Sequence, residues 1–135
     1  MILPDTSIWI DLLSAQPEYR PGPDQLVRFV TCGPIIQEVL QGLRPHPYAD
    51  AFREAFLALP RVGDPLGILT FLHAADIYHL GRSKGLTIRS SVDTLIAAIA
   101  IENRIPVWHK DRDFASIARF TSLRAVTRLQ VEPRR

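Results

Sequence analysis

The chain contains one cysteine, Cys32, among its 135 residues. A single cysteine cannot form an internal disulfide, and it excludes a zinc site built from several cysteines. The histidines are scattered without the spacing of zinc ligands, so we expect no metal role for them. They are His46, His73, His79 and His109. This cysteine usage suits a reducing compartment, and we expect a cytoplasmic protein.

Long apolar runs are also missing. No run reaches the roughly 18 residues that a membrane-spanning helix needs, so we expect no membrane partner. The opening string MILPDTSIWIDLL is interrupted by Asp5 and Asp11 and follows no basic stretch, which argues against a signal peptide. The length is close to the roughly 150 residues of an average domain, so we expect a single domain over residues 1–135.

Several catalytic motifs are absent. The sequence has no GxxxxGK[ST] or GxGxxG string, which disfavours an ATPase or a dehydrogenase. No GxSxG elbow surrounds Ser90 and Ser91, so we interpret these serines as helix caps. Of the 16 basic residues, all but Lys84 and Lys110 are arginines. Arginine suits phosphate binding, but a GC-rich genome produces the same bias, and a net charge of +2 does not by itself indicate a nucleic-acid binder.

Apolar residues recur with helical and strand spacing in alternating segments. The spacing predicts helices at 6–13, 25–30, 35–43, 49–59, 67–83, 92–103 and 114–120. It predicts strands at 1–4, 105–108 and 125–129, and a brief extended link or strand at 31–34. Parallel strands need crossover connections, which the helices supply, so we expect an α/β fold with a small, mostly parallel sheet. Pro4 lacks a backbone N–H and must lie at its strand's end or where no ladder bond is needed.

Acidic residues follow the first two predicted strands, where open α/β sheets place their sites. Asp5 comes directly after the first strand, and Asp111 and Asp113 come shortly after the second. Asp93 opens the apolar helix in SSVDTLIAAIA, and Glu38 lies in the helical segment PIIQEVLQG. In a parallel sheet Asp5 and Asp111 project from the same edge, and an acid that opens a crossover helix can join them.

Carboxylates crowded into one place repel one another and do not all ionise without compensation. A divalent cation removes this conflict, and oxygen ligands suit Mg²⁺ or Mn²⁺. Such an ion lowers the pKa of water and polarises a phosphoryl oxygen. The acidic residues therefore suggest metal-assisted phosphodiester hydrolysis.

Each acid also has a purely structural interpretation. Asp5 can cap the helix that follows it, and Asp111 or Asp113 can cap the helix predicted at 114–120. Asp93 lies in a first helical turn, where a carboxylate complements the helix dipole. Glu38 falls off the apolar face of its helix, as an exposed glutamate does. Spacing alone does not bring these side chains within ligand distance.

Four strings occur in order along the chain: DTSxWID, xxEVLxG, SxDxLIAAxA and DRDF. Together they resemble the PIN-domain ribonucleases, and in particular the VapC-type toxins of bacterial toxin–antitoxin systems. The resemblance covers essentially the whole chain. It implies a PIN-like three-layer sandwich, in which a small sheet is flanked by helices.

The resemblance also implies roles for the acids. Asp5, Asp93 and Asp111 match metal ligands, and Glu38 matches a ligand that binds directly or through water. Asp113 shares or replaces the role of Asp111, an alternative that the sequence leaves open. Thr6 and Ser7 match small hydroxyl residues that support the acids or contact phosphate.

The activity implied by the resemblance is Mg²⁺- or Mn²⁺-dependent endonucleolytic cleavage of RNA, such as tRNA or rRNA. The implied partners are a second copy of the chain, as a homodimer, and an antitoxin whose C-terminal tail occupies the active-site groove. With four acids in a pocket, the rest of the chain is clearly basic and suits a polyanion. The basic residues expected to touch phosphate are Arg82, Lys84, Arg89, Lys110 and Arg112.

Some assignments stay open. His109 is near Asp111 and is a candidate substrate contact, while Phe52 and Phe56 belong either to the core or to a partner groove. A degenerate scaffold of the same family would bind RNA or protein without catalysis. A phosphotransfer domain with an acidic pocket and one Mg²⁺ is a further alternative, although Lys110 is a poor companion lysine and no DxDx[TV] string occurs.

Overall fold

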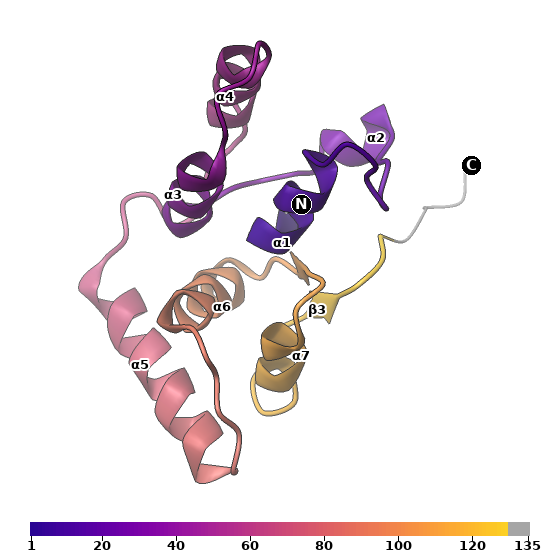
Figure 1. Cartoon of the computed structure of the whole chain (residues 1–135). Helices are drawn as coiled ribbons and strands as arrows, with labels where there is room; N and C mark the ends of the chain where they lie inside the picture. The colour runs from indigo at the N-terminus through magenta and orange to yellow at the C-terminus, as the bar shows by residue number, and fades with distance from the viewer. Residues whose placement is uncertain (130–135) are drawn as a thin grey trace.

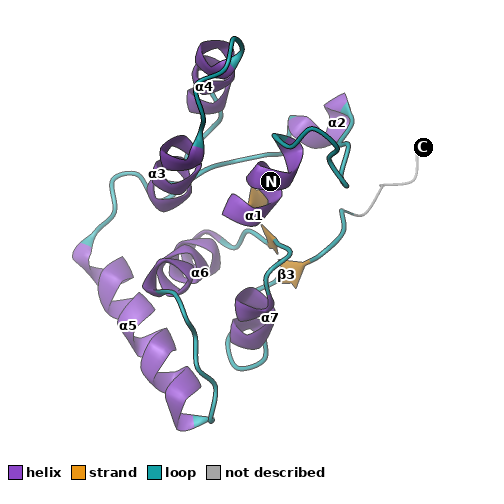
Figure 2. Cartoon of the chain, in the orientation of Figure 1, coloured by secondary structure: helices purple, strands orange, loops and turns teal. Residues whose placement is uncertain are grey.

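Three short strands form a parallel sheet at the centre of the molecule, in the order β1-β2-β3. The computed structural model describes residues 1–129. The strands are β1 (Leu3–Pro4), β2 (Val107–Trp108) and β3 (Ala125–Val126). The helices of the described residues are α1 (Thr6–Leu12), α2 (Pro23–Leu26), α3 (Gly33–Gly42), α4 (Ala49–Leu57), α5 (Ile68–Ser83), α6 (Ser91–Asn103) and α7 (Arg112–Ala118) (Figures 1 and 2). The predicted α/β class, with a small parallel sheet flanked by helices, is confirmed.

Pro4 is the last residue of β1, as its missing N–H requires. The ladder bonds on either side come from its neighbours: the Leu3 N–H donates to the Pro106 carbonyl (3.0 Å) and the Asp5 N–H donates to the Trp108 carbonyl (2.9 Å). β1 and β2 are therefore joined up to the point where Asp5 leaves the strand.

Helix α6 passes through the middle of the core and contacts α3, α5 and α7 (Figure 1). Its central residues are almost fully buried, and Ile96, Ala97 and Ile99 are each 1% exposed or less. The Ser90 hydroxyl accepts a hydrogen bond from the Val92 N–H and caps its first turn, as predicted. Burial on all sides fixes the direction of α6 and hence the position of its N-terminal turn.

Several predicted element boundaries are wrong, and three of the differences have a clear local description. The helix predicted at 25–30 is instead α2, which begins at Pro23, because a proline is favoured in a first helical turn. The strand predicted at 125–129 has only two residues, Ala125 and Val126. The helix predicted from 114 begins at Arg112, because the Asp111 carboxylate caps it. Among the described helices, none has the length and apolar character needed to cross a membrane.

Candidate functional site

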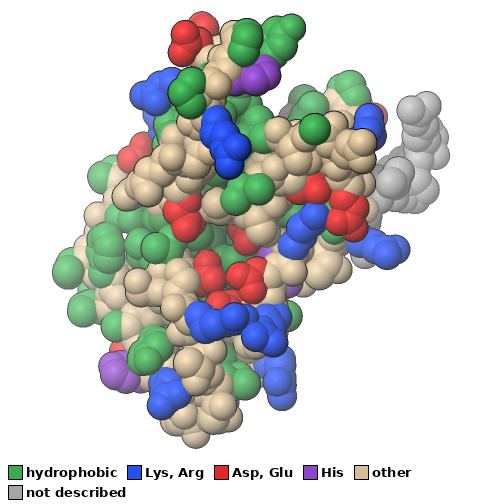
Figure 3. Space-filling view, viewed as in Figure 1, with side chains coloured by type: hydrophobic (Ala, Val, Ile, Leu, Met, Phe, Trp, Pro, Cys, Tyr) green, Lys and Arg blue, Asp and Glu red, His purple; other side chains and the backbone are tan. Residues whose placement is uncertain are grey.

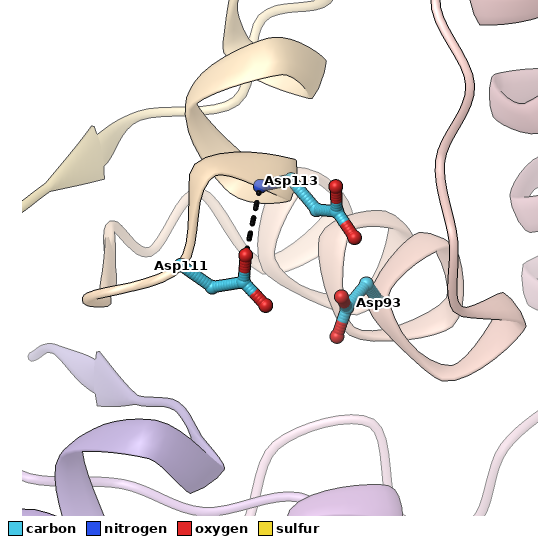
Figure 4. A group of neighbouring side chains, drawn as sticks. All are labelled: Asp93, Asp111 and Asp113. Atoms are coloured by element: carbon cyan, nitrogen blue, oxygen red, sulfur yellow. Dashed lines mark hydrogen bonds between the residues drawn. The ribbon is translucent and has the colours of Figure 1, made fainter.

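Three aspartates meet between α6 and α7 (Figure 4). Asp93 lies in the first turn of α6, Asp111 caps α7, and Asp113 lies in the first turn of α7. One carboxylate oxygen from each residue lies within 4.8 Å of the other two. Three oxygen donors at this separation match the ligand type and spacing that a divalent cation needs.

The turn that carries Asp111 is held by local bonds. The Asp113 N–H donates to Oδ1 of Asp111 at 3.3 Å, and the buried His109 ring places Nδ1 2.5 Å from the Asp111 carbonyl oxygen. A carbonyl only accepts, so Nδ1 is the protonated nitrogen of His109. His109 as a whole is 2% exposed, so it shapes the turn from inside, and this burial argues against the substrate contact considered from the sequence.

Asp5 is buried at the start of α1, where its Oδ1 accepts from the Ser7 hydroxyl (2.5 Å) and from the Ile8 N–H (3.2 Å). It is thus a helix cap, as the structural interpretation predicted. Burial raises the pKa of Asp5, the bonds from Ser7 and Ile8 lower it, and the charge of Asp111 raises it. Asp111 therefore lies near enough to Asp5 for their charges to repel each other.

Glu38 comes from the middle of α3. Its Oε1 accepts a hydrogen bond of 2.8 Å from the Thr6 hydroxyl at the start of α1. Thr6 and Ser7 therefore each hold one carboxylate: Thr6 holds Glu38, and Ser7 holds Asp5.

Asp93 has the most perturbed carboxyl group of the site. Burial raises its pKa, and the surrounding negative charges raise it further, to about 7. Those charges belong to Asp111, Asp113, Asp5 and Glu38, in decreasing order of effect. Asp111 and Asp113 both lie within 4.8 Å of Asp93, whereas Asp5 and Glu38 are not in this close group and act on Asp93 only through their charge.

Basic side chains border the acidic group on the same face of the molecule (Figure 3). Arg89 Nε lies 3.9 Å from Oδ1 of Asp113, and Arg112 is exposed at the start of α7. The Lys110 ammonium, which we expect to touch phosphate, bonds to Asp11 and Glu18, with Nζ 2.9 Å from an oxygen of each. Its charge is therefore paired within the protein. Arg82 donates to the Thr87 hydroxyl.

Asp11 was not singled out in the sequence, although it bonds directly to the residue before Asp111. One signal was available: Ser7 and Asp11 are four positions apart and therefore lie on the same face of α1. That face meets the turn at Lys110, whose N–H donates to the Ser7 hydroxyl.

The PIN domain family model matches residues 2–120. The chain is 35% identical to VapC ribonuclease Mb1587 of Mycobacterium bovis and to ribonuclease VapC11 of Mycobacterium tuberculosis. Each match covers 94% of this chain and 98% of the relative.

Two solved structures share the fold at 16% sequence identity. FitAB bound to an IR36 DNA fragment has a TM-score of 0.64 over 93% of this chain and 94% of its own. FitAcB from Neisseria gonorrhoeae has a TM-score of 0.63 over 93% of this chain and 96% of its own. With the family model matching most of its length, the chain belongs to the PIN-domain family, among relatives named as VapC ribonucleases.

Proposed function

We propose that this chain is a Mg²⁺- or Mn²⁺-dependent endoribonuclease that acts as the toxin of a toxin–antitoxin pair. The observation that carries the proposal is the close group of Asp93, Asp111 and Asp113, whose carboxylate oxygens lie within 4.8 Å of one another. Burial and the charges of four neighbouring acids raise the pKa of Asp93 to about 7. Such a group of acids is costly to keep together unless a cation offsets the repulsion. Membership of the PIN-domain family and 35% identity to VapC ribonucleases support RNA as the substrate.

The donor set fits a hard divalent cation. Asp93, Asp111 and Asp113 offer carboxylate oxygens within 4.8 Å of one another, and we assign these residues as ligands, together with Asp5. Mg²⁺ and Mn²⁺ prefer oxygen ligands, whereas the described residues place no cysteine or histidine in this group. When bound, the cation supplies a Lewis acid that offsets phosphate charge and lowers the pKa of water.

The remaining residues orient the reactants. Glu38, held by the Thr6 hydroxyl, positions the attacking water and accepts its proton, while Ser7 keeps the Asp5 carboxylate turned toward the other acids. Arg89 and Arg112, at the border of the acidic group, contact phosphates of the RNA. We expect products with a 5′-phosphate and a 3′-hydroxyl.

The partner of the proposed toxin is an antitoxin that covers the site. A cavity of about 560 Å³ lies beside Glu38 and is lined mainly by apolar side chains of α1, α3 and α4, among them Ile10, Val39 and Phe52. This groove supports docking of an antitoxin tail next to the acids. We also expect a homodimer, and a structured RNA such as tRNA or rRNA as the substrate.

The test is cleavage of tRNA and rRNA by the purified chain with Mg²⁺ or Mn²⁺, with a chelator, and by an Asp5→Asn variant. We expect cleavage with either metal, none with the chelator and none with the variant. Cleavage that continues in excess chelator overturns the metal-dependent mechanism. Retained RNA binding without Mn²⁺ binding or cleavage identifies the chain as a non-catalytic scaffold.

A further inference from the structure

We propose that Asp11 and Lys110 form a positioning pair that holds the Asp111 turn against α1 and thereby sets the affinity of the acidic site for its cation. This inference rests on the proposed metal-dependent function. It gives Lys110 a role other than phosphate contact.

Lys110 connects two parts of the chain that are 99 residues apart. Its Nζ lies 2.9 Å from Oδ1 of Asp11 and 2.9 Å from Oε2 of Glu18, and it lies 5.1 Å from the centre of the Tyr19 ring. The Asp11 side chain is only 9% exposed, so solvent screens this partner less than it screens a typical surface carboxylate.

The backbone of Lys110 is bonded to the same helix. Its N–H donates to the Ser7 hydroxyl at 3.2 Å, and that hydroxyl donates to Oδ1 of Asp5 at 2.5 Å. Ser7 and Asp11 are one turn apart on α1, so Lys110 is fixed to this helix at two points. One of these points continues directly to a carboxylate of the site.

Asp11 is itself held rigidly. Its two carboxylate oxygens accept hydrogen bonds of 3.1 Å from the N–H groups of Glu18 and Tyr19. The Lys110 ammonium and these backbone bonds hold the pKa of Asp11 below its usual value.

The physical need for such a pair follows from the repulsion at the site. Asp111 is exposed, and the ladder between β1 and β2 ends at Trp108, before the turn begins. Asp5, Asp93 and Asp111 carry like charges and repel one another while no cation is bound. The bonds from Lys110 to α1 hold the turn in place against this repulsion. Holding the ligands near their bound positions lowers the cost of reorganising them when a cation enters.

The test is Mn²⁺ binding to the intact chain without RNA, measured by calorimetry, for wild type, Asp11→Asn and Lys110→Met. We expect each variant to lose about tenfold in Mn²⁺ affinity, the lower end of the effect seen when residues that orient metal ligands are changed. Lys110→Arg keeps a cation that can bond both carboxylates, and we expect it to recover most of the affinity. Glu18→Gln removes the other carboxylate partner of Lys110 at a side chain that is 67% exposed. We expect it to fold and to weaken Mn²⁺ binding, so it tests the role of Lys110 even where Asp11→Asn or Lys110→Met fails to fold.

Arg61→Met is the matched control. It removes the exposed Arg61–Asp64 pair, which lies outside the acidic group, and we expect it to leave Mn²⁺ affinity unchanged. Melting temperatures of all variants separate a change in affinity from loss of fold.

A different result is expected if Lys110 contacts phosphate. Lys110→Met then weakens RNA binding with no change in Mn²⁺ affinity. Asp11→Asn leaves RNA binding unchanged, or tightens it by releasing the Lys110 ammonium. That pattern overturns the positioning role. If wild type itself binds no Mn²⁺, the proposed function fails, whereas normal binding by wild type and by both variants refutes only this inference.

Discussion

The Thr6 hydroxyl donates a hydrogen bond of 2.8 Å to Oε1 of Glu38, a residue 32 positions further along the chain. The bond joins the first residue of α1 to the middle of α3, and it holds the one acid of the site that comes from α3. Glu38 is therefore oriented by a side chain adjacent to Asp5.

We expect Thr6→Val to reduce RNA cleavage by about tenfold, because Glu38 loses the hydrogen bond that orients it. We also expect a loss of about 1.5 kcal/mol in stability, the lower end of the range for a hydrogen bond to a charged group. The change is nearly isosteric and leaves every carboxylate in place. Cleavage rates at saturating RNA report the effect.

The chain offers a matched control for this variant. Thr70 makes the same kind of bond to Glu102, at 2.9 Å and over the same separation of 32 residues, on an exposed part of α5 and α6. We expect Thr70→Val to cleave RNA at the wild-type rate. Equal rates for Thr6→Val and wild type would show that Glu38 needs no such orientation.

We expect Asp93→Asn to abolish cleavage and to raise the melting temperature of the metal-free protein. The variant removes the carboxylate that burial and four neighbouring acids destabilise most. Thermal unfolding in chelator and RNA cleavage in Mn²⁺ measure the two effects. Asp76→Asn, which changes an exposed acid on α5, serves as the control. An Asp93→Asn protein that cuts RNA at the wild-type rate rules out the proposed site.

The stability of the metal-free protein should fall as the pH rises from the unfolded pKa of Asp93, 3.8, to its folded value of about 7. In this window the folded chain keeps a proton that the unfolded chain has released, so raising the pH favours unfolding, and the loss levels off above about 7. Asp5, whose pKa is also raised, acts in the same direction.

Mn²⁺ should reverse this trend, because the cation binds the deprotonated carboxylates. We expect a larger rise in melting temperature on adding Mn²⁺ at about pH 8 than at about pH 5. Melting curves across the pH range, with and without the metal, provide the measurement. A metal effect that does not depend on pH would place the cation away from Asp93.

We expect Asp111→Asn and Asp113→Asn each to weaken Mn²⁺ binding, since both carboxylates lie within reach of Asp93. Asparagine keeps an oxygen that can cap α7 at Asp111, whereas Asp111→Ala should in addition lose about 1 kcal/mol of stability. Calorimetry on the two asparagine variants decides the question that the sequence leaves open. Wild-type affinity in either variant would leave the other aspartate as the only ligand of the pair.

Much of the local structure was predictable because it follows local rules. The burial of α6 follows from its nearly continuous apolar sequence, and its start at Ser91 follows from a capping serine at Ser90. Pro4 lies at the end of β1 because proline has no N–H to donate. The bounds of α2 were not predictable, because a short helix depends on a few turn residues and not on a repeated apolar pattern.

Sequence alone determined which acids this protein has and which helix or strand end carries each of them, because capping and periodicity act over a few residues. The tertiary structure decided that Asp113 joins Asp111 beside Asp93, and that the Lys110 ammonium is bonded to Asp11. Asp11 and Lys110 are 99 positions apart, so their contact arises only when packing of the whole chain brings α1 against the turn after β2. No local pattern carries that information, because side-chain partners at such separations are selected by the shape of the folded core.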